Sequence, residues 1–126
     1  MLKQRTLRNP IKAVGIGLHT GKNITMELLP AEVNTGINFI RSDISEGFLI
    51  PAIAENVGDT SLSTALIKDD IKISTIEHLL SAIAGLGVDN CVIKVNGPEV
   101  PIMDGSSSPF VFLIQSAGAQ DWDALK

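Results

Sequence analysis

The chain has 126 residues, 44% of them hydrophobic and 19% charged, a composition that is typical of one globular domain and excludes a disordered segment. The formal net charge of −4 argues against a general role in nucleic-acid binding, and the single cysteine excludes a disulfide framework. The N-terminal residues lack the apolar core of a signal peptide, and no stretch approaches the ~20 apolar residues of a membrane span, so we expect a cytoplasmic protein.

The start of the sequence predicts strands joined by tight turns. Gln4 to Leu7 and Ile11 to Ile16 form the first pair, separated by a turn-forming Asn-Pro step. The glycine-rich segment from Gly15 to Gly21 then predicts a tight connection that displays His19 on a loop. A loop histidine is either a functional group or a turn residue bonded to nearby backbone, and the residues alone leave both interpretations open.

Basic residues are concentrated before the first acidic residue, Glu27. Such a basic edge either meets an anionic ligand or consists of solvated charges that protect the edge of a sheet. The residues concerned are Lys3, Arg5, Arg8, Lys12 and Lys22.

The middle of the sequence continues the strand pattern. Asn23 to Leu29 alternates as a half-buried strand, Ile37 to Arg41 predicts another, and Pro51 makes Phe48 to Ala54 an edge or irregular strand. From Asp59 to Ile67 small polar residues alternate with apolar ones. This segment predicts one strand, whose hydroxyl groups form either a wetted sheet face or the wall of a ligand site.

The sequence is organised around a strand, Ile71 to Ser74, that leads directly into a helix. Ser74 is the predicted N-cap, and Glu77, three residues on, is predicted to complete a capping box. Apolar residues at helical spacing give the helix a buried face, and a glycine can end it in a left-handed conformation. These residues are Ile76, Leu79, Leu80 and Ile83, with Gly85 or Gly87 at the end.

Glu77 and His78 stand side by side in the first turn of this helix, about 100° apart around its axis, and both can border a cleft that opens at the helix N-terminus. A neutral imidazole there can bind a metal, and a carboxylate can take a proton from water. The same residues also fit a helix cap and a surface or packed histidine. One histidine cannot hold a catalytic zinc ion, which needs about three protein ligands.

After this helix the pattern gives one more strand, Cys91 to Val95, and one more helix, which begins at the N-cap Ser108 with Pro109 at its first position and ends at Gly118. Ala119 to Lys126 shows no partner pattern and is expected to lead out of the domain. The sequence therefore predicts an α+β fold, a two-layer sandwich of a mostly antiparallel sheet with two amphipathic helices on one face, plus a small strand insert.

Several ordered blocks together resemble the N-terminal half of the zinc-dependent UDP-3-O-acyl-N-acetylglucosamine deacetylases of lipid A biosynthesis. The resemblance implies two similar α+β domains packed helix layer to helix layer, of which residues 1–126 are the first, with a metal at their junction. The blocks that carry it are Lys3 to Leu7, Gly15 to Gly21, Asp59-Thr60, Ile73 to His78, Ala84 to Asn90 and Glu99 to Phe110.

The resemblance also implies roles for individual residues. His78 matches the zinc ligand that the first domain supplies, and Glu77 matches the general base that deprotonates the zinc-bound water for attack on the acetamide. The other zinc ligands (a His and an Asp four residues apart), the general acid and a Thr that assists the oxyanion belong to the second domain. His19 matches a family histidine near the site. The positions that lie near the substrate in relatives are Leu18, Ser61, Leu62 and Ser63.

Two functions follow as expectations. In the first, the chain is the first half of a deacetylase that acts on an acylated UDP-amino sugar, inactive and weak in Zn²⁺ binding without its second domain. In the second, it is a stand-alone, non-catalytic binding or scaffold domain of the same fold. In either case a helix face left without its partner is expected to favour self-association.

Overall fold

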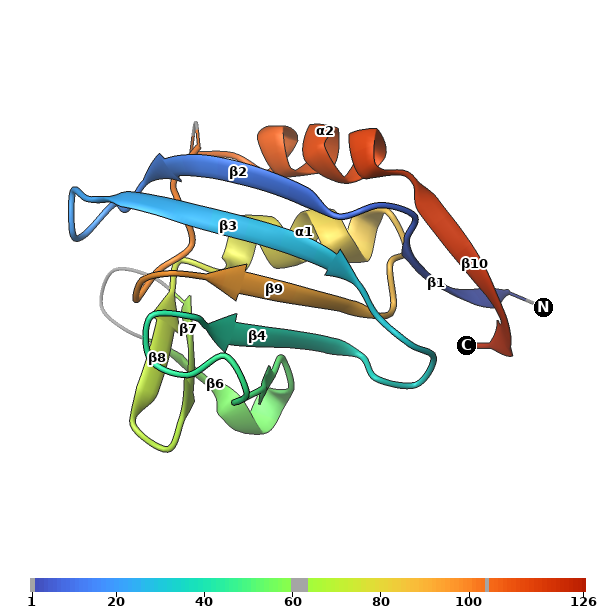
Figure 1. Cartoon of the computed structure of the whole chain (residues 1–126), viewed down its shortest axis with the longest axis horizontal. Helices are drawn as coiled ribbons and strands as arrows, with labels where there is room; N and C mark the ends of the chain where they lie inside the picture. Colours follow the sequence, from blue (N-terminus) through green and yellow to red (C-terminus); the bar gives the residue numbers. More distant parts are fainter. Residues whose placement is uncertain (1, 60–63, 104) are drawn as a thin grey trace.

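The fold centres on a five-stranded sheet. A computed structural model describes residues 2–59, 64–103 and 105–126 of the chain (Figure 1). The β4 and β9 strands run parallel, and the other neighbouring strands of this sheet are antiparallel. In spatial order the strands are β2 (Ile11–Ile16), β3 (Asn23–Pro30), β9 (Cys91–Val95), β4 (Ile37–Arg41) and β5 (Ile50–Pro51).

Both helices pack on one face of this sheet, so the predicted two-layer α+β sandwich is confirmed (Figure 1). The helices are α1 (Glu77–Gly85) and α2 (Ser108–Ala117). Leu79 and Ile83 of α1, and Phe110 and Ile114 of α2, join the apolar side chains of β3 and β9 in one core. Phe112, on the other side of α2, is 69% exposed. No helix in the described ranges is long and apolar enough to cross a membrane.

A three-stranded sheet forms the predicted strand insert and leads into α1. Its strands, β6 (Val57–Asp59), β7 (Thr64–Lys68) and β8 (Ile71–Ser74), follow the short 3-10 helix η1 (Ala54–Asn56). The prediction of one strand from Asp59 to Ile67 is wrong, because Asp59 and Thr64 are antiparallel partners on two strands. Asp69 and Asp70 have φ angles of 50° and 66°, which suit the two-residue turn between β7 and β8.

The C-terminal residues do not lead out of the domain as predicted. They form β10 (Ala119–Leu125), which pairs antiparallel with β1 (Lys3–Leu7) in a two-stranded sheet. The indole Nε1–H of Trp122 donates to the carbonyl of Ala31 at 3.0 Å and ties β10 to the end of β3. Local periodicity could not reveal this strand, because its partner lies at the opposite end of the sequence.

The predicted helix ends are confirmed, whereas the predicted starts are not. Gly87 follows α1 with φ 70° and Gly118 ends α2 with φ 80°, both positive φ angles that favour glycine. The N-cap of α2 is Ser107 rather than Ser108, and no side chain caps it. The start of α1 also differs from the prediction and is described with the site below.

The arrangement separates two ends of the molecule. In Figure 1 the turn between β2 and β3 and the start of α1 lie at the left-hand end, and both chain termini lie at the right-hand end. The loop that carries Leu18 and His19 and the start of α1 with Glu77 and His78 therefore lie at the end away from the termini.

Candidate active site

The chain enters α1 through a strained turn instead of a capping box. Ser74 is not the N-cap but the last residue of β8, and its amide donates to the carbonyl of Pro98 at 2.8 Å. The N-cap is Ile76, which has no side chain capable of capping. Between them Thr75 has φ 62°, a left-handed conformation that is rare for a β-branched residue and is often found at functional sites. This turn places Glu77 at the first position of the helix.

Glu77 is held from β7 and not from its own helix. Its Oε2 atom accepts a hydrogen bond from the backbone amide of Thr64 at 3.2 Å. The carbonyl of Thr64 in turn accepts the amides of Thr75 at 2.9 Å and Ile76 at 3.4 Å. The predicted capping role of Glu77 is therefore wrong, and the start of β7 takes the place of the cap. The hydrogen bond from Thr64 orients the Glu77 carboxylate, and the Glu77 side chain stays half-buried.

His78 is also half-buried, whereas its neighbours Ile76 and Leu79 are completely buried. Neither Glu77 nor His78 is therefore part of the apolar core. His78 offers a single imidazole as a metal ligand, and the described part of the chain contains no group of three or more His, Cys, Asp or Glu side chains that could hold a metal. The residues fit zinc as one ligand and one adjacent carboxylate, and about two more protein ligands are needed to complete a catalytic site.

The loop between β2 and β3 displays His19, as predicted. The loop is closed by a hydrogen bond from the Gly17 amide to the Lys22 carbonyl at 2.9 Å, and Gly21 adopts a left-handed φ of 68°. Leu18 is 52% exposed and His19 is exposed. Both side chains thus belong to a surface loop and are available for contact with a ligand.

A hollow of about 210 Å³ joins this loop to the strand that precedes Glu77. Glu77 and His78 are not among the residues that line it. The candidate substrate residues Ser61, Leu62 and Ser63 lie outside the described residues. The hollow is lined by His19, Thr20, Lys72, Ser74, Pro98 and Glu99. Sequence analysis did not single out Glu99, although its position among Pro98, Val100 and Pro101 marks a carboxylate in an apolar segment.

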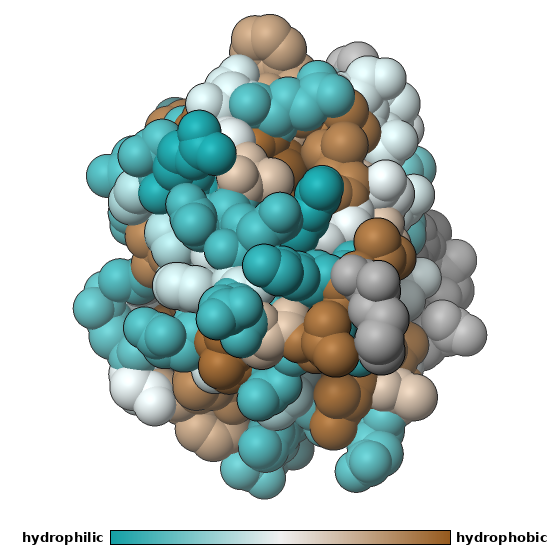
Figure 2. All heavy atoms as spheres, turned by 90° about the vertical axis from the view of Figure 1, so that its right-hand side faces the viewer, coloured by the Kyte–Doolittle hydropathy of each residue, from teal (hydrophilic) through white to brown (hydrophobic). Residues whose placement is uncertain are grey.

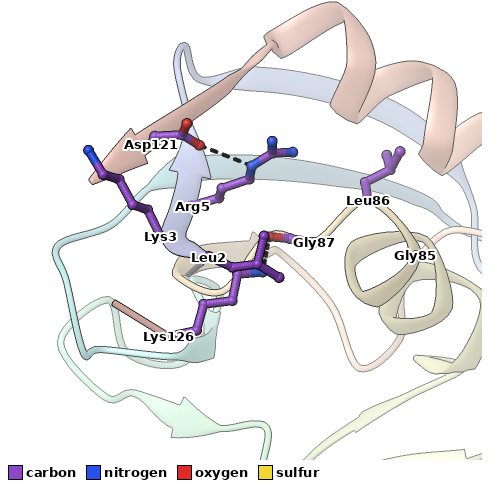
Figure 3. A pocket seen from close by; sticks show the side chains of 8 residues that line it. All are labelled: Leu2, Lys3, Arg5, Gly85, Leu86, Gly87, Asp121 and Lys126. Atoms are coloured by element: carbon purple, nitrogen blue, oxygen red, sulfur yellow. Dashed lines mark hydrogen bonds and ion pairs between the residues drawn. The ribbon is translucent and has the colours of Figure 1, made fainter. Parts of the chain in front are cut away.

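A second hollow, of about 520 Å³, lies at the opposite end, beside the termini (Figure 3). Figure 2, which faces this end, shows polar side chains across its middle and hydrophobic groups above and below. The basic residues here have acidic partners: Lys3 pairs with Asp123 at 3.7 Å, Arg5 with Asp121 at 3.0 Å and Lys126 with Asp89 at 3.3 Å. Lys3 and Arg5 therefore pair with carboxylates of the neighbouring strand β10.

Comparison with known proteins identifies the family of the chain. Residues 4–126 match the profile of the family described as UDP-3-O-acyl N-acetylglycosamine deacetylase. The match covers nearly the whole chain, including α1. The chain belongs to this family.

Curated relatives matched along the whole chain are named UDP-3-O-acyl-N-acetylglucosamine deacetylase. The relative from Methylococcus capsulatus is 60% identical over 126 residues, and those from Cellvibrio japonicus and Teredinibacter turnerae are 62% and 59% identical. The match covers 100% of this chain but only 41% or 42% of each relative. The chain thus spans about two fifths of the length of the curated relatives it matches.

Proposed function

We propose that the chain is the first domain of a zinc-dependent amidohydrolase that removes acetate from UDP-3-O-(3-hydroxyacyl)-N-acetylglucosamine in lipid A biosynthesis. The observation that carries the proposal is the family match over residues 4–126, with a half-buried carboxylate and a half-buried imidazole side by side where α1 begins. The proposal places the protein in the cytoplasm, which agrees with its free thiol, Cys91.

In this proposal His78 is the single zinc ligand that the chain supplies. A catalytic zinc ion needs about three protein ligands, so the others come from residues outside this chain. The length of the relatives leaves room for a second domain that supplies them. The exposed Phe112 on the outer side of α2 supports packing of that domain against the helix layer.

Glu77 is the proposed general base. Zinc, when bound, polarises the acetamide carbonyl and lowers the pKa of water at the site to about 7. The carboxylate of Glu77 takes the proton from the attacking water, and the amide of Thr64, 3.2 Å from Oε2, fixes the direction of the carboxylate. The strained turn at Thr75 delivers Glu77 and His78 together at the helix N-terminus, where backbone amides favour developing negative charge.

The loop of Leu18 and His19 is proposed to contact the substrate, together with Ser61, Leu62 and Ser63. Support for the loop is its exposure and the hollow that connects it with the strand before Glu77. For Ser61, Leu62 and Ser63 the support is the family resemblance alone.

The experiment is acetate release from the UDP-3-O-acyl-N-acetylglucosamine substrate by the full-length protein. The proposal predicts turnover that a strong chelator abolishes and added zinc restores, and no turnover by residues 1–126 alone. A full-length protein without turnover at any zinc concentration would contradict the proposal and favour a non-catalytic binding domain.

A further inference from the structure

Glu99 is a carboxylate placed inside the protein, only 1% exposed. Burying a carboxylate is costly unless hydrogen bonds replace its hydration. Here the donors are backbone amides of the loop: His19 N lies 3.0 Å from Oε1 and 3.3 Å from Oε2, and Thr20 N lies 2.9 Å from Oε2. Both oxygens accept hydrogen bonds, which a carboxylate can do and a glutamine side chain, with one acceptor oxygen, cannot do equally.

The loop fits closely around this carboxylate. A Cβ atom at Gly17 would lie 2.7 Å from Oε2 of Glu99 and 2.5 Å from Oγ1 of Thr20, closer than real side chains approach. Gly17 is therefore required by the contact with Glu99 and not by its backbone angles. The loop and the carboxylate form one packed unit.

The segment that carries Glu99 is itself fixed on two sides. The Val100 amide donates to the Ser74 carbonyl at 3.0 Å, and the Ser74 amide donates to Pro98. On the other side, the Ile102 amide donates to the carbonyl of Ile16, the last residue of β2, at 2.8 Å. The segment therefore bridges the edge of the five-stranded sheet and the strand that ends three residues before Glu77.

From these contacts we propose that Glu99 is a positioning residue that holds the loop of Leu18 and His19 in register with the start of α1. It acts through the loop, because its own carboxylate is buried and its oxygens are occupied by the amides of His19 and Thr20. Only one part of this inference, the role of His19 at the site, rests on the proposed function. The contact between Glu99 and the loop stands on the geometry alone.

The first test measures the contact without measuring activity. In the full-length protein Glu99→Gln is expected to accelerate hydrogen exchange of the His19 and Thr20 amides at least about tenfold, because one acceptor is replaced by a donor. Amides in β3 and β9 should exchange at the wild-type rate. Unchanged exchange at His19 and Thr20 would overturn the proposal, whatever the enzyme does.

The second test is a double-mutant cycle on deacetylation. Glu99→Gln is expected to lower kcat/KM about tenfold in the wild-type background and less than about twofold in the His19→Ala background, since the effect passes through His19. Equal losses in both backgrounds would mean that Glu99 only stabilises the fold, and would overturn the positioning role. A wild-type protein without activity would instead refute the proposed function, which the exchange experiment does not depend on.

Two further variants guard against a trivial loss of folding. Gly17→Ala pushes against the same carboxylate from the loop side and should give the same exchange and the same non-additive cycle. Asn96→Ala is the matched control, because it removes another hydrogen bond from a side chain to the β2–β3 hairpin, accepted from Thr25 N at 2.9 Å. It should leave the exchange of His19 and Thr20 unchanged, and accelerated exchange there would contradict a specific role for Glu99.

Discussion

Replacing Thr75 by valine is expected to stabilise the protein. The Thr75 hydroxyl is buried in a residue that is 5% exposed, and it has no hydrogen-bond partner among the described residues. A buried polar group without a partner costs about 1–3 kcal/mol, and valine replaces it with a methyl group whose burial contributes roughly 0.8 kcal/mol. Both side chains are β-branched, so the cost of the left-handed φ of 62° is similar in the two proteins.

The assay is urea unfolding of the chain. Thr75→Val should raise the free energy of unfolding by about 1–3 kcal/mol at an unchanged m-value. Thr75→Ser is the matched control, since it keeps the hydroxyl and removes the methyl group, and it should lower the same quantity by about 1 kcal/mol. A Thr75→Val protein that is less stable than wild type by more than about 1 kcal/mol would refute the reasoning, because it would mean that the hydroxyl is hydrogen-bonded.

Three further predictions concern the interior and the metal. Asn90→Ala should cost about 2–4 kcal/mol in urea unfolding, because this 1%-exposed side chain accepts the amides of Thr35 and Gly36 and donates to Gln4; a loss below about 1 kcal/mol would contradict it. Burial raises the pKa of the Cys91 thiol from 9.0 to about 12, so iodoacetamide at pH 8 should modify Cys91 only after unfolding. The raised pKa also makes the free energy of unfolding depend on pH: the contribution of the buried thiol is complete below pH 9 and is lost as the pH rises towards 12. Cys91→Ala should remove this loss at high pH. Calorimetric titration of residues 1–126 with Zn²⁺ should show weak binding, since His78 is the one zinc ligand that the proposal assigns to these residues, and one-to-one binding at submicromolar Kd would be inconsistent with a shared site.

Much of the fold could be predicted because its information is local. The alternation in β3 and the glycines that end α1 and α2 are each encoded within a few residues. These features fix strand and helix positions without knowledge of the rest of the chain. The α+β class followed from them.

Two of the incorrect predictions, and one contact that was missed, share a physical cause, which is contact between residues far apart in the sequence. β10 pairs with a strand more than a hundred residues earlier in the sequence. The Glu77 carboxylate accepts a hydrogen bond from the amide of Thr64 in β7 and caps no amide of its own helix, so the sequence has the capping-box pattern but the structure has no capping box. The contact between Glu99 and the loop amides spans 80 residues, and only the fold brings the two together.

The candidate site was predictable in part for the same reason. The adjacency of Glu77 and His78 and the loop position of His19 are properties of short segments. The direction in which the Glu77 carboxylate is held, and the carboxylate that holds the His19 loop, depend on tertiary packing. Sequence patterns can therefore identify candidate reacting groups, whereas the groups that orient these candidates are seen only in the folded chain.

The central claim, that Glu77 and His78 divide base and ligand roles in a zinc site shared with the rest of the protein, is tested most directly by bound zinc and turnover in two full-length variants. Glu77→Gln should keep its zinc and lose turnover by about 10²–10⁴-fold, as expected when a general base is removed. His78→Ala should lose both zinc and turnover. Equal zinc loss in the two variants, or wild-type turnover in either, would contradict the claim.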